Sequence, residues 1–81
     1  MNAEQMFKKL GYKLVRNNMY ERLNLICYKI DSYDDNSSSI VFKLEDKTFY
    51  AYQYCEPKDV TMDELKAINQ QCKELGWIEN A

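Results

Sequence analysis

The chain has 81 residues, 46% of them hydrophobic and 30% charged, with only two Gly and one Pro. These values exclude a disordered, low-complexity or multidomain chain, so we expect one small globular domain spanning residues 1–81. Its 11 basic and 13 acidic residues give a formal charge of −2, which disfavours nucleic-acid binding through a general positive field.

The three cysteines, Cys27, Cys55 and Cys72, lie far apart, and the chain has no histidine. A structural zinc site usually needs four Cys or His ligands, so we expect no metal, no other cofactor, and three buried thiols in a reducing compartment. The start of the chain lacks the apolar run of a signal peptide, and no stretch of 18 apolar residues occurs. We therefore expect a cytoplasmic protein without a membrane segment.

A short helix is predicted at the N-terminal end. Asn2 and Gln5 have the spacing of a reciprocal capping box, and Gly11 supplies a left-handed helix end. The apolar residues between them recur at helical spacing: Ala3, Met6, Phe7 and Leu10. A helix this short is not stable alone in water, so its apolar stripe must pack on the rest of the domain.

Strand patterns follow the first helix. Residues 12–16 and 19–30 are rich in β-forming side chains, and Asn17-Asn18 between them suits a tight hairpin turn. The apolar residues of 19–30 change side within the run, which indicates either two buried faces or a β-bulge.

The most polar stretch covers residues 31–39, which we expect to form a connecting loop. With Glu45, its residues Asp34, Asn36 and Ser38 match four ligand positions of an EF-hand loop. Ser39 occupies the position that requires Gly for the sharp turn, and a strand pattern follows directly. We therefore expect a solvated loop and no calcium site.

A hairpin with two apolar faces comes next, with strands at 40–45 and 48–54 joined by Asp46-Lys47. A two-residue loop predicts three cross-strand pairs: Leu44 with Phe49, Phe42 with Ala51, and Lys43 with Tyr50. The core side of this hairpin carries Ile40, Phe42, Leu44, Phe49 and Ala51. The opposite side carries Val41, Tyr50, Tyr52 and Tyr54.

The C-terminal helix has the clearest signals. Thr61 and Glu64 form a capping box, and Gly76 with Trp77 matches the end of a Schellman motif. Its predicted apolar stripe consists of Leu65, Ile68, Cys72 and Leu75.

These elements predict a two-layer α+β domain: an N-terminal helix, an antiparallel β-meander of three to four strands, and a C-terminal helix. Two short helices offer little area to cover both faces of the last hairpin. One aromatic face is therefore expected to be left for a partner.

The candidate site is this aromatic face, namely Tyr50, Tyr52 and Tyr54 with Val41 and Lys43 beside them. Three interpretations remain open: burial under a helix or in a homodimer, contact with another protein, and base stacking on single-stranded nucleic acid with help from Lys29 and Lys43. The negative net charge places nucleic acid last. The chain has no His, nucleophile elbow, phosphate-binding Gly loop or metal motif, so we expect no enzymatic activity.

Two stretches carry a resemblance to known sequences: residues 46–50 and residues 56–77, together with Met1-Asn2-Ala3-Glu4 and Lys9-Leu10-Gly11-Tyr12. They resemble small uncharacterised proteins encoded by phages and prophages of Firmicutes. The resemblance implies a phage or prophage origin and expression in the cytoplasm of a bacterial host. It implies no activity, cofactor or functional residue.

Overall fold

The computed structural model describes residues 1–30, 37–54 and 56–79. In chain order the elements are α1 (Ala3–Lys9), β1 (Lys13–Leu14), α2 (Asn18–Arg22), β2 (Leu25–Ile30), β3 (Ser38–Lys43), β4 (Thr48–Gln53), β5 (Glu56–Pro57) and α3 (Met62–Glu74). The strands form one antiparallel sheet in the order β1-β2-β3-β4-β5. The α+β prediction is therefore confirmed, with five strands in place of the expected three to four.

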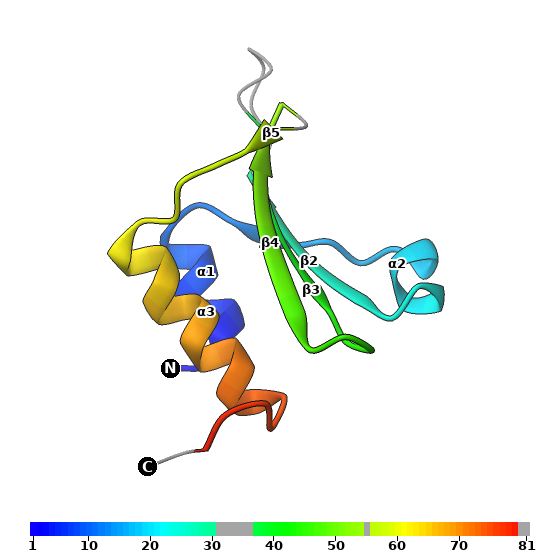
Figure 1. The fold of residues 1–81 in the computed structure, drawn as a ribbon. Coiled ribbons are helices and arrows are strands. Elements are labelled where there is room, and N and C mark those ends of the chain that lie inside the picture. Colours follow the sequence, from blue (N-terminus) through cyan, green and yellow to red (C-terminus); the bar gives the residue numbers. More distant parts are fainter. Residues whose placement is uncertain (31–36, 55, 80–81) are drawn as a thin grey trace.

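The helices lie on both sides of the sheet (Figure 1). α1 and α3 pack side by side on one side, and the short α2 lies on the other. We call the side under α1 and α3 the core face and the opposite side the tyrosine face. None of the helices in the described part of the chain is long and apolar enough to cross a membrane.

Both predicted capping boxes are confirmed. The side chain of Asn2 accepts a hydrogen bond from the backbone N–H of Gln5, and that of Thr61 accepts one from the N–H of Glu64. Because these contacts satisfy backbone donors that have no partner within the helix, they fix where α1 and α3 begin.

The two helices also end in the same way. Gly11 and Gly76 have φ values of +94° and +74°, and in each case the next residue donates its N–H back into the last turn. Those next residues are Tyr12 and Trp77, which join the hydrophobic core. Each glycine therefore stops a helix and returns an aromatic side chain to the domain interior.

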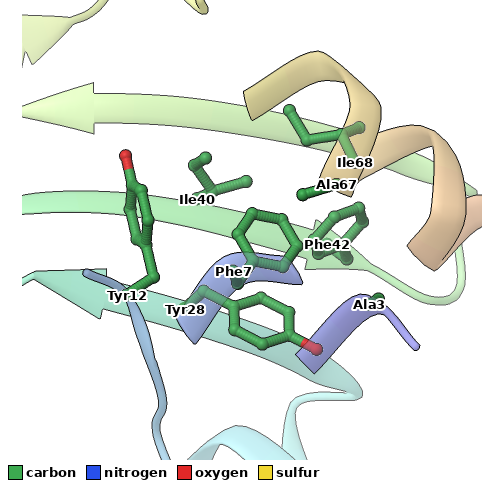
Figure 2. Packing of buried hydrophobic residues seen from close by; sticks show 8 residues of the cluster. All are labelled: Ala3, Phe7, Tyr12, Tyr28, Ile40, Phe42, Ala67 and Ile68. Atoms are coloured by element: carbon green, nitrogen blue, oxygen red, sulfur yellow. The ribbon is translucent and has the colours of Figure 1, made fainter. Parts of the chain in front are cut away.

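The core lies between α1, α3 and the sheet (Figure 2). Phe7 of α1 stacks on Tyr28 of β2, with ring centroids 4.0 Å apart, and meets Phe42 of β3 edge to face. Ala67 and Ile68 of α3 close the other side of this cluster. The alternation along β3 thus places Ile40 and Phe42 on the core face, as the sequence predicted.

The predicted apolar stripe of α3 is partly wrong. Ile68 is buried and Cys72 and Leu75 are half-buried, but Leu65 is 44% exposed. The buried face of α3 instead includes Glu64 and Gln71. These polar side chains are buried because tyrosine hydroxyls from the other layer supply hydrogen bonds that replace water.

The predicted turn at Asn17-Asn18 is wrong. The side chain of Asn17 accepts a hydrogen bond from the N–H of Met19 at 2.8 Å and caps α2, within a run predicted as strand. Asn24, at φ +55°, follows this helix, and β2 begins at Leu25. The apolar pattern changes side in this run because a helix precedes the strand, and because β2 then buries residues on both faces.

The predicted register of the last hairpin is also wrong. The structure pairs Phe42 with Phe49 and Ile40 with Ala51, and β3 ends at Lys43. The turn has four residues, Leu44–Lys47, and ends on Lys47 at φ +57°. For the residues within β3 and β4 the faces are nevertheless as predicted, because a pairing shift of two residues preserves the side to which each residue points. Leu44, predicted on the core side of the strand, lies instead in the turn.

The loop predicted at residues 31–39 ends earlier than expected, because β3 begins at Ser38. Ser38 and Ser39 belong to β3, so their backbone lies in the sheet ladder. Glu45 lies in the hairpin turn, where it accepts a hydrogen bond from the Asn24 side chain. Asp34, Asn36 and Cys55, which figured in the sequence predictions, lie outside the described residues.

Candidate functional site

Two tyrosines dominate the tyrosine face. In β4, Tyr50 and Tyr52 alternate with Phe49 and Ala51, so they point away from α1 and α3. Their rings stack with centroids 5.6 Å apart and an interplanar angle of 24°. The pair is thus a preformed aromatic ridge along one strand.

Lys43 of β3 completes this ridge. Its Nζ lies 5.4 Å from the centroid of the Tyr50 ring, within the range of a cation–π contact. Lys43 is in register with Thr48, two residues before Tyr50, whereas Tyr52 is two residues after it. The ammonium group and Tyr52 therefore approach Tyr50 from opposite ends of the strand, and both ring faces of Tyr50 are occupied.

A buried floor lies beneath the tyrosines. Cys27 of β2 and Val41 of β3 are in register with Tyr50, and both are almost fully buried. Tyr20 reaches this floor from α2: the Cys27 thiol, partial burial and Tyr52 all raise the pKa of Tyr20. Burial, followed by Tyr52, raises the pKa of Tyr50. Tyr20 and Tyr50 therefore lie near Cys27 and near Tyr52.

The structure brings together only some of the predicted site residues. Tyr50 is 41% exposed, Tyr52 is half-buried, and Lys43 is exposed beside them. Val41 is 2% exposed, so it supports the ridge from below and has almost no surface for a partner. Tyr54 has left the strand, since β4 ends at Gln53 and Tyr54 occupies the following turn at φ +55°.

Two residues of this face, Tyr20 and Lys13, were not predicted from the sequence, whereas Lys29 was named there as a candidate for nucleic-acid contact. Tyr20 of α2 lies next to Cys27. It was not predicted because residues 19–30 were interpreted as a strand, and the only sequence signal for α2 was Asn17 as an N-cap. Lys13 of β1 and Lys29 of β2 are registered partners on the tyrosine face, and Lys29 is next to Ser39, which pairs with Tyr52. Lys13 is visible as belonging to this face only once the β1–β2 pairing is known.

The charge of this face differs from that of the whole chain. Its sheet positions include Lys13, Lys29 and Lys43 and no acidic residue among those described, although the chain carries a net charge of −2. The neighbouring α2 adds one residue of each sign, Glu21 and Arg22. The aromatic ridge is therefore flanked by positive charge.

A second cluster of ionisable groups lies between the sheet and α3. Lys58 Nζ donates to both carboxylate oxygens of Glu64 at 2.8 Å, and the Tyr12 hydroxyl also donates to Glu64. Burial opposes the charged form of Glu64, but the hydrogen bonds from Lys58, the Thr61 N–H and Tyr12 outweigh it and lower its pKa. Because these charged and polar groups bind one another, the cluster has a structural role in linking α3 to the rest of the domain.

The described cysteines offer no activated thiol. Burial raises the pKa of the Cys27 thiol, although Lys29 and Tyr20 act in the opposite direction, and burial also raises the pKa of Cys72. A nucleophilic cysteine needs a lowered pKa. The described residues also contain no group of three or more His, Cys, Asp or Glu side chains able to hold a metal ion.

Comparison with known proteins adds no constraint on function: no protein-family model, no curated protein and no solved structure matches this chain.

Proposed function

We propose that the protein is a non-enzymatic interaction module that binds another protein, or a second copy of itself, through the tyrosine face. The observation that carries the proposal is the stacked pair of exposed Tyr50 and half-buried Tyr52 beside Lys43. Tyrosine rings combine apolar area with a polar hydroxyl, and they are enriched at protein interfaces for that reason.

The fixed positions of the Tyr50 and Tyr52 side chains support this function. Stacking holds both rings, and Lys43 and the floor of Cys27 and Val41 also hold Tyr50. A side chain held in its bound position loses less conformational entropy when a partner docks. Tyrosine side chains carry both a ring and a hydroxyl group, so they can contact apolar and polar groups of a partner together.

A second candidate function, binding of single-stranded nucleic acid, is favoured by the positive flank of Lys13, Lys29 and Lys43. Phosphate contacts from lysine are the main source of such binding, and aromatic rings supply stacking. It ranks second because stacking needs a free ring face, and both faces of Tyr50 are covered by Tyr52 and Lys43.

We further propose that the protein is of phage or prophage origin and acts in the cytoplasm of a bacterial host. This rests on the sequence resemblance of the two ends and the last hairpin. The partner would then be a host or phage protein present in the same cytoplasm.

The test is a quantitative pull-down from a lysate of the host bacterium. The wild type, Tyr50→Ser and Tyr52→Ser are compared with Met62→Ser, which removes an exposed apolar side chain from the start of α3. We expect one or more proteins to be retained by the wild type and by Met62→Ser and to be lost from both tyrosine variants. Equal recovery with all four proteins would contradict the proposal.

Nucleic-acid binding is tested separately with an oligothymidylate in a gel-shift titration. At about 50 mM salt, phosphate contacts are strong, so the absence of a shift removes this function. A shift that is lost in Tyr50→Ser would instead place nucleic acid ahead of protein.

A further inference from the structure

The edge of the sheet at β4 is distinct from the tyrosine face. β5 pairs only with Tyr52 and Gln53, and just beyond it the Lys58 N–H donates to the carbonyl of Ala51 at 3.2 Å. From Thr48 to Tyr50, β4 has no strand partner on this side among the described residues. In Figure 1 this is the half of β4 next to its turn with β3.

The register identifies the backbone groups that this edge exposes. In a strand, the N–H and C=O of one residue point the same way, and successive residues alternate. Because the Ala51 carbonyl points toward Lys58, the N–H and C=O of Phe49 point to the same side, away from β3. Phe49 therefore offers one donor and one acceptor at an open edge.

The side chains at this edge do not protect it. Proteins usually guard an edge with proline, a charged residue or a bulge. Pro57 and Lys58 do so for the part of β4 that β5 covers, but Thr48, Phe49 and Tyr50 are uncharged β-formers. Phe49 is also 41% exposed, although it belongs to the core face.

We propose that this edge pairs with the same edge of a second copy, giving an antiparallel dimer centred on Phe49. A two-fold axis through the contact lets each Phe49 N–H donate to the Phe49 carbonyl of the other copy. Residues directly opposite in an antiparallel pair point to the same face, so the two Phe49 rings meet on the core side. The two sheets then form one continuous sheet.

A second copy fits this edge better than an extended peptide does. Backbone bonds are few for either occupant, because the free stretch is only three residues long, bounded by the turn at Lys47 and by Lys58, so side chains must decide. A folded copy brings ordered side chains to both faces at once. It also places the two tyrosine faces side by side, although this proposal does not depend on their function.

Amide hydrogen exchange at two protein concentrations tests the proposal. The Tyr50 N–H points toward β3 and should be protected at any concentration, whereas the Phe49 N–H is protected only in the dimer. We expect Phe49 exchange to slow about two- to fourfold between about 20 μM and about 1 mM, because a short edge gives a weak dimer and the amide exchanges from the remaining monomer. The expected sedimentation change is from monomer toward dimer over the same range.

Variants at Phe49 complete the test. Phe49→Lys places two like charges at the two-fold axis and should keep the protein monomeric, whereas Phe49→Leu should retain the dimer. The proposal is overturned if Phe49 exchange does not depend on concentration, or if a dimer forms equally well in Phe49→Lys. If the dimer persists in Phe49→Lys and is lost in Tyr50→Ser, the dimer contact is assigned to the tyrosine face. Should Phe49→Lys fail to fold, the wild-type exchange data decide alone.

Discussion

Among single residues, Glu64 has the most unusual position, because it is a carboxylate on the buried face of a helix. It closes the capping box of α3, accepts the Tyr12 hydroxyl and pairs with Lys58, and so joins three parts of the chain. A pattern of apolar residues cannot reveal such a residue, since its partners come from distant positions. The same holds for Gln71, whose side-chain oxygen accepts the Tyr28 hydroxyl at 2.6 Å.

Replacing Glu64 with Gln should destabilise the protein by about 2 to 3 kcal/mol, because a largely buried lysine loses its counter-charge. Urea unfolding followed by circular dichroism measures the difference. The control is Glu45→Gln in the exposed hairpin turn, which should change the unfolding free energy by less than about 0.5 kcal/mol. Equal effects at both positions would contradict the structural role of the Glu64–Lys58 pair.

The same variant predicts a pH dependence. The folded-state pKa of Glu64 is lowered from 4.5, so its contribution is present above pH 4.5 and is lost as the pH falls through the folded-state pKa. The stability difference between wild type and Glu64→Gln should therefore shrink as the pH falls below 4.5. Unfolding free energies at pH 7 and at successively lower pH values test this, and a constant difference would show that Glu64 is not the titrating group.

Among the elements, α1 and α3 were predicted well because their limits are set locally. Capping boxes and C-terminal glycines act within a few residues, so the sequence contains both partners of each contact. α2 was missed because its five residues are weak helix signals between two strands, and its place depends on packing against β2. The four-residue turn before β4 was missed because Asp46-Lys47 alone suggested a shorter loop.

The end of α3 gives a test at this scale. Gly76 has φ +74°, and a Cβ added there would meet no atom within 4 Å, so alanine would cause backbone strain without a clash. We expect Gly76→Ala to cost about 1 to 2 kcal/mol and Gly76→Asn to cost less, because Asn tolerates this conformation better. Thermal unfolding ranks the three proteins. An alanine variant as stable as the wild type would contradict the left-handed helix end.

For the whole molecule, the central question is how 81 residues cover both faces of a sheet. α1 and α3 cover the core face, whereas on the other face α2 packs on β2 and the buried centre is limited to Cys27, Ser39 and Val41 among the described residues. The sequence predicted the two faces of the hairpin, with Tyr50 and Tyr52 pointing away from the core face. It did not predict that Tyr20 and the rings of Tyr50 and Tyr52 shield Cys27 and Val41, because that depends on where α2 folds back.

The candidate site was accordingly predicted in part. Tyr50, Tyr52 and Lys43 form one ridge, as their spacing on adjacent strands suggested. Tyr54 was assigned to the same row because alternation was extended one residue beyond the strand. Lys13 joins the face through a pairing that spans residues 13 to 29, which no local pattern indicates.

Photo-crosslinking in the host cell tests the proposed function most directly. Benzoylphenylalanine is incorporated at position 50 on the tyrosine face, or at position 62 at the start of α3 as the control; both native side chains are exposed. We predict a defined crosslinked protein product from position 50 and none of that mass from position 62. No product from position 50, or the same product from both positions, would contradict the assignment of the tyrosine face as the interaction surface.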